Sequence, residues 1–149
     1  MSQRSSSRRT GGEPTARPGV RRAPLGPGVY DALERARDSL FAAAAAETPA
    51  ERYVAAHVGA LRIAAAVLAA RAQPTKRRAP RNAWDMLTRV APELTEWAAY
   101  FASGAPKRAA AEAGLPHAVS EREADDLLRD VELFLGVVEQ TLEIPTQAA

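Results

Sequence analysis

Apolar residues recur at steps of three and four along residues 28–143, which is the spacing of one face of an α-helix. The final segment is the clearest case. Its periodic apolar positions are Ala124, Leu128, Val131, Leu135, Val138 and Leu142. Residues 120–123 read Ser-Glu-Arg-Glu, the form of a capping box at a helix start, and Pro145 follows the segment. With no strand-like alternation and no Asn-Gly or Asp-Gly turn, the pattern predicts an all-α chain.

Two long helices are predicted in the first half of the chain, over residues 28–47 and from residue 49 to just before Pro74. Thr48 can cap the second helix, Pro49 suits its first position, and Glu51 can complete a capping box. The buried stripe expected on this helix consists of Val54, His57 or Val58, Leu61, Ala65 and Leu68. Small apolar residues lie beside that stripe, so we expect a two-fold dimer through this helix; they are Ala55, Ala56, Ile63, Ala64, Ala66 and Val67.

A third helix is predicted to begin at Asn82, which can cap it. Its apolar face consists of Trp84, Leu87, Ala91, Leu94, Ala98 and Phe101, and Trp97 broadens it. Pro92 lacks a backbone N–H, so a kink or restart is expected near residues 90–91. A short helix from Pro106 should end at Gly114, a natural left-handed stop. Together these segments predict an antiparallel bundle of four to five helices.

Charge is distributed unevenly along the chain. Residues 1–26 hold six arginines and one acid, whereas the remainder holds 14 basic residues and 17 acids. The first 26 residues also contain hardly any large apolar side chain, so they cannot offset the entropy of ordering. We therefore predict a disordered basic arm over residues 1–26, a bundle over 27–145 and a tail over 146–149. The alternative for the arm is an electrostatic contact with phosphates.

Composition excludes several kinds of chemistry. The chain has no cysteine, and its two histidines, His57 and His117, lie on different segments without a metal-ligand spacing. We expect no metal and no cofactor. Arginines interrupt the most apolar stretch at residues 52, 62 and 71, so no membrane span is expected, and the cytoplasm is the expected compartment.

The pair Arg52 and His57 is the candidate catalytic site. In metal-independent RNA cleavage, a histidine can transfer the 2′-hydroxyl proton while an arginine stabilises charge in the transition state. With 18 arginines and two histidines, however, such a spacing arises by chance about half the time. Five residues on a continuous helix also place the two side chains about 140° apart. The alternative is that His57 is a half-buried histidine hydrogen-bonded to a neighbouring helix.

A second candidate site is the connection after the second helix, which carries Lys76, Arg77, Arg78 and Arg81 between two prolines. These four cations are candidates for contact with an anion or RNA. The alternative is a solvated connector, because no aromatic residue is interleaved to stack on bases.

Three stretches resemble a family of small HEPN-domain proteins from high-GC, actinobacterial bacteria. Residues 51–57 read Glu-Arg-Tyr-Val-Ala-Ala-His, residues 90–94 read Val-Ala-Pro-Glu-Leu, and residues 123–130 read Glu-Ala-Asp-Asp-Leu-Leu-Arg-Asp. The resemblance covers about residues 28–142. It implies an HEPN-like helical bundle, usually a dimer, and many HEPN domains are metal-independent ribonucleases of toxin, defence or RNA-processing systems.

The family's catalytic motif is an arginine, four to six residues, then a histidine, which the resemblance places at Arg52 and His57. This chain differs by having Tyr53 directly after the arginine and by carrying the pair at the start of the second helix. We therefore expect a dimeric interaction module that binds RNA or a protein partner without catalysis. The alternative is a metal-independent endoribonuclease that uses Arg52 and His57.

Overall fold

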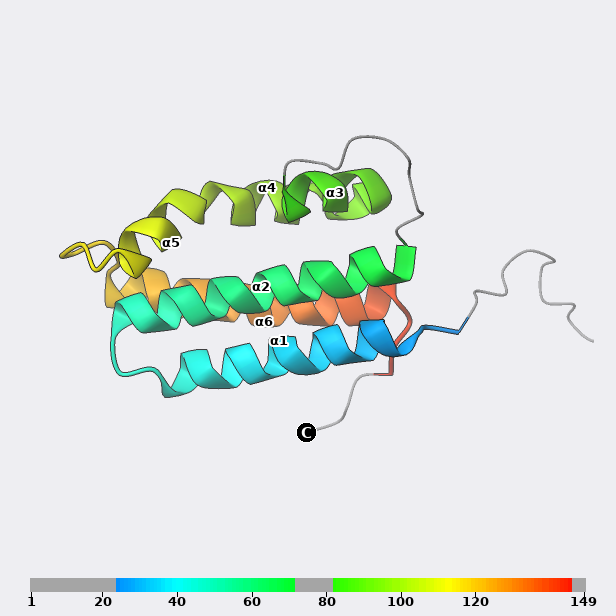
Figure 1. Cartoon of the computed structure of the whole chain (residues 1–149), viewed down its shortest axis with the longest axis horizontal. Helices are drawn as coiled ribbons and strands as arrows, with labels where there is room; N and C mark the ends of the chain where they lie inside the picture. Colours follow the sequence, from blue (N-terminus) through cyan, green and yellow to red (C-terminus); the bar gives the residue numbers. More distant parts are fainter. Residues whose placement is uncertain (1–23, 72–81, 146–149) are drawn as a thin grey trace, which may run out of the picture.

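The computed structural model describes residues 24–71 and 82–145, and these residues form helices connected by short turns (Figure 1). The elements are α1 (Pro27–Ala45), α2 (Pro49–Arg71), α3 (Ala83–Val90), the 3₁₀-helix η1 (Pro92–Leu94), α4 (Thr95–Ser103), α5 (Ala105–Glu112) and α6 (Glu121–Thr141). No strand occurs in the described part of the chain. The prediction of an all-α helical bundle is confirmed.

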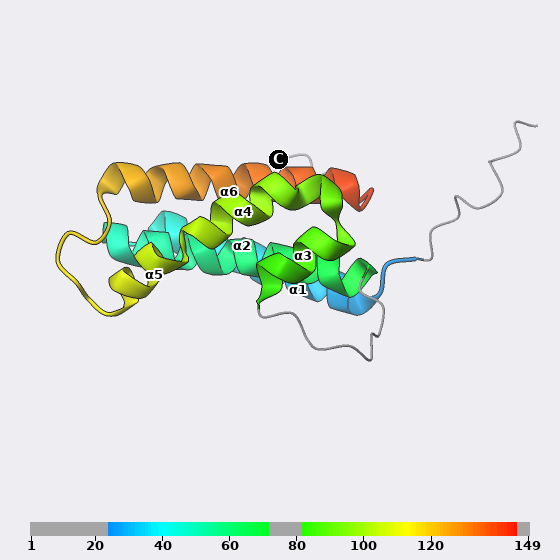
Figure 2. The same ribbon diagram turned by 90° about the horizontal axis from the view of Figure 1, so that it is seen from above.

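Helix α2 lies at the centre of the bundle. It packs along α1 and α6 and also contacts α3 and α5. Figures 1 and 2 show the three long helices side by side, with α3, α4 and α5 forming a broken layer over α2 and α6. Residues 51–60 of α2 and residues 121–130 of α6 therefore lie at the same end of the bundle as α5.

Local signals in the sequence set most helix starts. The Ser120 hydroxyl accepts from the Glu123 backbone N–H, and the Glu123 carboxylate accepts from the Ser120 N–H, so the capping box is complete. Asn82 Oδ1 accepts from the Asp85 N–H at the start of α3, and Thr48 Oγ1 accepts from the Glu51 N–H. These three predicted helix starts are confirmed.

Helix ends follow the expected signals at two places and depart from them at a third. Helix α3 ends at Val90, just before the 3₁₀-helix that begins with Pro92. Helix α5 ends before Gly114, whose φ is 72°. Helix α6 ends at Thr141, four residues before Pro145. Glu143 adopts a φ of 58° and the Ile144 N–H bonds back to the Glu139 carbonyl, so a left-handed turn ends this helix before the proline.

Aromatic side chains fill the space between the α3–α4 layer and α6. Trp84 and Phe101 stack with centroids 5.3 Å apart, and Phe101 lies 5.0 Å from Phe134 of α6. Trp97 completes the cluster at 5.4 Å from Phe134. Trp84 is therefore buried in the core, and Trp97 is partly buried and packs against it, as the apolar periodicity predicts.

The predicted dimer surface on α2 is wrong. Five of its six residues are fully buried within a single chain: Ala56, Ile63, Ala64, Ala66 and Val67 have no exposed area. The predicted buried stripe of α2 is wrong as well, because Ala65 is exposed and Val54, Leu61 and Leu68 are only partly buried. Helix α2 is apolar nearly all round because α1, α3, α5 and α6 surround it. By length and mean hydropathy alone, α2 could also cross a membrane, but half of its most apolar stretch is buried inside the bundle.

Several predicted features lie outside the described residues. These are residues 1–23 of the basic arm, the cationic connection with Lys76, Arg77, Arg78 and Arg81, and the tail over 146–149. Residues 24–26 are described, and Leu25 packs partly against the core.

Candidate functional site

The guanidinium of Arg52 joins the end of α1 to the start of α6. Its Nε donates to the Ala43 carbonyl at 3.1 Å and its Nη2 donates to the Ala46 carbonyl at 3.0 Å. Its Nη1 lies 2.5 Å from Asp125 Oδ1. The last carbonyls of a helix lack partners within that helix, so a cation there satisfies them and matches the negative end of the dipole. The described contacts of Arg52 are structural.

The imidazole of His57 points the other way, into the interior between α2, α4 and α5. The residue is 2% exposed. Its Nε2 lies 3.1 Å from the Phe101 carbonyl, and its Nδ1 lies 3.4 Å from Arg108 Nη1. Trp84 meets the ring edge-on, with centroids 6.3 Å apart.

These contacts fix the tautomer and the charge of His57. A guanidinium can only donate, so Nδ1 accepts from Arg108 and Nε2–H donates to the Phe101 carbonyl. Burial lowers the pKa of His57 below its usual value, and the positive charge of Arg108 lowers it further, against opposing effects of the Phe101 carbonyl and of Glu112. His57 is therefore a neutral side chain with both ring nitrogens occupied.

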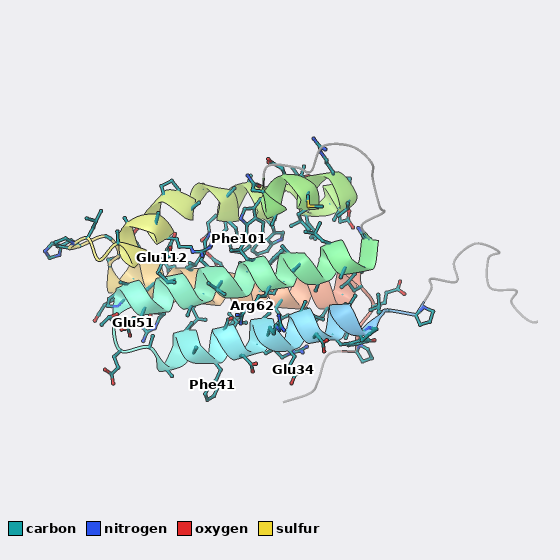
Figure 3. All side chains as sticks on the ribbon, in the orientation of Figure 1. Glu34, Phe41, Glu51, Arg62, Phe101 and Glu112 are labelled. Carbon is teal, nitrogen blue, oxygen red and sulfur yellow. The ribbon has the colours of Figure 1, made fainter. Side chains whose placement is uncertain are left out.

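The structure does not join the two predicted catalytic residues. Arg52 is held by the end of α1 and by Asp125, whereas the cation beside the His57 ring is Arg108. Arg108 lies 51 residues away in the sequence, and its Nε also pairs with Glu112 at 2.9 Å. In Figure 3, Phe101 and Glu112 lie on the α4–α5 side of α2, where these partners of His57 are found.

A pocket of about 310 Å³ opens beside His57, where α2, α4, α5 and α6 meet. Ten residues line it: Tyr53, His57, Tyr100, Phe101, Ser103, Gly104, Lys107, Glu123, Asp126 and Leu127. Its volume is at the small end of the range for ligand pockets. We call it the Tyr53 pocket.

The Tyr53 hydroxyl faces this pocket. The residue is 6% exposed, and no hydrogen bond joins its hydroxyl to another described residue. Gly104 makes room for that hydroxyl, because a methyl group at residue 104 would lie 2.8 Å from Tyr53 Oη. Burial raises the pKa of Tyr53, which keeps the hydroxyl protonated.

Two ion pairs and one further hydroxyl surround the opening of the Tyr53 pocket. Lys107 pairs with Glu123, and Asp126 pairs with Arg129 at 3.0 Å. The Tyr100 hydroxyl donates to Asp130 Oδ2 at 2.5 Å. Among the described residues, no group of three or more histidines or carboxylates could hold a metal ion.

Of the residues in this region, the sequence singled out His57 but not Arg108 or the other residues that line the pocket. Tyr53, Tyr100, Lys107 and Asp126 come from four helices, and no motif or spacing relates them. The only local signal was Gly104, which lies between two helices and next to the buried Tyr53.

Comparison with known protein families agrees with this architecture. Residues 43–139 of the 149 match the family model described as HEPN_SAV_6107-like HEPN. The match covers α2 to α5 and most of α6. No curated protein and no solved structure matches the chain. The matched length shows that the chain belongs to the SAV_6107-like HEPN family.

Proposed function

We propose that this HEPN domain is a non-catalytic interaction module that binds a protein partner and associates with a second copy of itself. The state of His57 carries the proposal. A general acid or base must reach the proton that it transfers, and both nitrogens of this buried ring already bond to Phe101 and Arg108. Arg52, the other half of the predicted pair, binds the end of α1.

The charge of the bundle favours a protein over RNA as the partner. Residues 27–145 contain 17 acids and 14 basic residues, a net charge of −3. RNA binding depends on cations that neutralise phosphates, so an acidic surface opposes it. A basic protein segment has the complementary charge.

The outer face of α1 supports self-association. Phe41 is 78% exposed and Tyr30 is 51% exposed, and one helical face carries both together with Glu34 and Arg37. Figure 3 shows Glu34 and Phe41 pointing away from the bundle. If two copies of α1 pack antiparallel about a two-fold axis between residues 35 and 36, Tyr30 faces Phe41 and Glu34 faces Arg37 across the interface.

A nuclease assay tests the absence of catalysis. The purified protein in EDTA is incubated with single-stranded RNA, and the products are examined for 2′,3′-cyclic phosphate ends. We expect no cleavage above that of a protein-free sample. Cleavage that disappears in His57→Ala, with the melting temperature preserved, would overturn the proposal and favour the endoribonuclease that uses Arg52 and His57.

Light scattering tests the self-association. We expect a dimer at high micromolar concentration, and Phe41→Asp should convert it to a monomer because it places a charge against Tyr30 of the second copy on both sides of the two-fold axis. Leu133→Asp is the matched control, since Leu133 is 56% exposed on α6 and should leave the dimer intact. A wild-type protein that stays monomeric would contradict the self-association.

A further inference from the structure

The Tyr53 pocket is richer in hydrogen-bond acceptors than in free donors. Its lining includes two carboxylates, Glu123 and Asp126, and one ammonium group, Lys107. Lys107 is already paired with Glu123, so Asp126 supplies the remaining charge. Among the described residues, the ion-pair partner of Asp126 is Arg129 of its own helix, and both side chains are about half exposed or more. An exposed pair of this kind contributes little and exchanges readily for a better-placed cation.

Tyr53 provides an independent sign of a ligand. The residue is 6% exposed, and its hydroxyl bonds to no other described residue but remains accessible from the pocket. An accessible hydroxyl on an otherwise buried side chain can accept a hydrogen bond from a ligand in the pocket. Gly104 keeps this position open, because any side chain there would displace the hydroxyl.

The aromatic wall of the pocket favours a planar cation. Tyr100 is 44% exposed and lines the opening, where its ring can lie against a flat cationic group. Its pKa is raised by burial, by the bond to Asp130 and by neighbouring groups that include Asp126. The opening therefore disfavours a negative charge.

From this geometry we propose that the Tyr53 pocket binds the guanidinium of an arginine side chain from a basic protein segment. The guanidinium stacks on Tyr100, donates to the Asp126 carboxylate and donates to the Tyr53 hydroxyl oxygen. Five N–H donors, no acceptor and a planar shape match these groups better than a lysine ammonium does. The inference rests on the proposed function, since it names the chemical group by which the protein partner is recognised.

Binding to short probes tests this assignment. N-acetyl-arginine amide, its lysine analogue and its neutral citrulline analogue are titrated into the full chain and followed by NMR. Arginine should bind at least about tenfold more tightly than citrulline, because citrulline keeps the shape and loses the charge. Equal affinities for arginine and citrulline would overturn the proposal.

Two conservative variants locate the binding. Tyr53→Phe removes only the hydroxyl and should weaken arginine binding about three- to tenfold. Asp126→Asn removes the charge and should weaken it about tenfold or more. The matched control is Asp38→Asn, on the exposed side of α1, which should leave binding unchanged. Unchanged binding in both pocket variants, at unchanged melting temperature, would overturn the assignment.

Two further measurements distinguish a guanidinium carried by a protein from a small free guanidinium compound, and distinguish this inference from the proposed function. A six-residue peptide with one central arginine should bind more tightly than methylguanidine, and equal binding would contradict a protein source for the group. A basic peptide that still binds the pocket variants fully would overturn this inference and leave the proposed function standing. RNA cleavage by a protein whose pocket binds arginine would overturn the proposed function alone.

Discussion

Replacing His57 by alanine distinguishes a core residue from a catalytic one. The substitution removes an imidazole that is 2% exposed and lies 3.1 Å from the Phe101 carbonyl. It also removes the edge-on contact with Trp84. If the ring is structural, the variant must lose stability, whereas a catalytic ring at the surface could be removed at little cost.

The expected loss can be worked from these contacts. Truncating a buried ring leaves a cavity that costs about 2 kcal/mol, and the lost hydrogen bond adds about 1 kcal/mol. No larger penalty is expected, because the Phe101 carbonyl keeps its bond from the Gly104 N–H and Arg108 keeps Glu112. The free energy of unfolding should fall by about 3 kcal/mol, which lowers the melting temperature by about 10 °C in a domain of this size.

Thermal and urea unfolding followed by circular dichroism measure this effect. His57→Gln retains an N–H donor for the Phe101 carbonyl and should lose about half as much stability. The control is His117→Asn: His117 is exposed and has a φ of 58°, a conformation that asparagine also tolerates, so its melting temperature should stay within about 1 °C of wild type. A His57→Ala protein that melts within about 2 °C of wild type would refute the structural role.

Three further predictions follow from the same contacts. Burial lowers the folded-state pKa of His57, so the folded chain binds fewer protons there than the unfolded chain, and the free energy of unfolding should be highest above about pH 6.5 and fall below it. Melting scans between pH 7.5 and 5.5 should show this decline, and His57→Gln should make it smaller. Arg52→Ala should lower the free energy of unfolding in urea by about 1–2 kcal/mol because it leaves the carbonyls at the end of α1 without their donor, and Arg52→Lys should lower it by less. Asp125→Asn should change it little because that carboxylate is 60% exposed, and equal losses in Arg52→Ala and Asp125→Asn would contradict the capping role. Ser120→Ala should cost about 1 kcal/mol through loss of the α6 capping box, and an unchanged urea midpoint would contradict it.

Local sequence signals determined where most helices begin, and the helical period located the buried faces of α3, α4 and α6. Ser120, Asn82 and Thr48 bond to backbone N–H groups within three residues of themselves, so their effect needs no tertiary contact. Pro92 interrupts its helix for an equally local reason, the missing N–H. The period did not locate the buried face of α2. Of its predicted stripe only His57 is buried and Ala65 is exposed, because the helices packed around α2 decide which side is covered.

Only the tertiary structure decided which groups the side chains of Arg52 and His57 contact. Arg52 and His57 are five residues apart, yet their partners come from α1 and α6 in one case and from α4 and α5 in the other. Sequence spacing cannot show this, because the partners lie up to 73 residues away and are brought near by helix packing. For the same reason the surplus apolar face of α2 suggested a dimer contact. Packing against neighbouring helices of the same chain buries that face, so the bundle itself, and not a second copy, accounts for its composition.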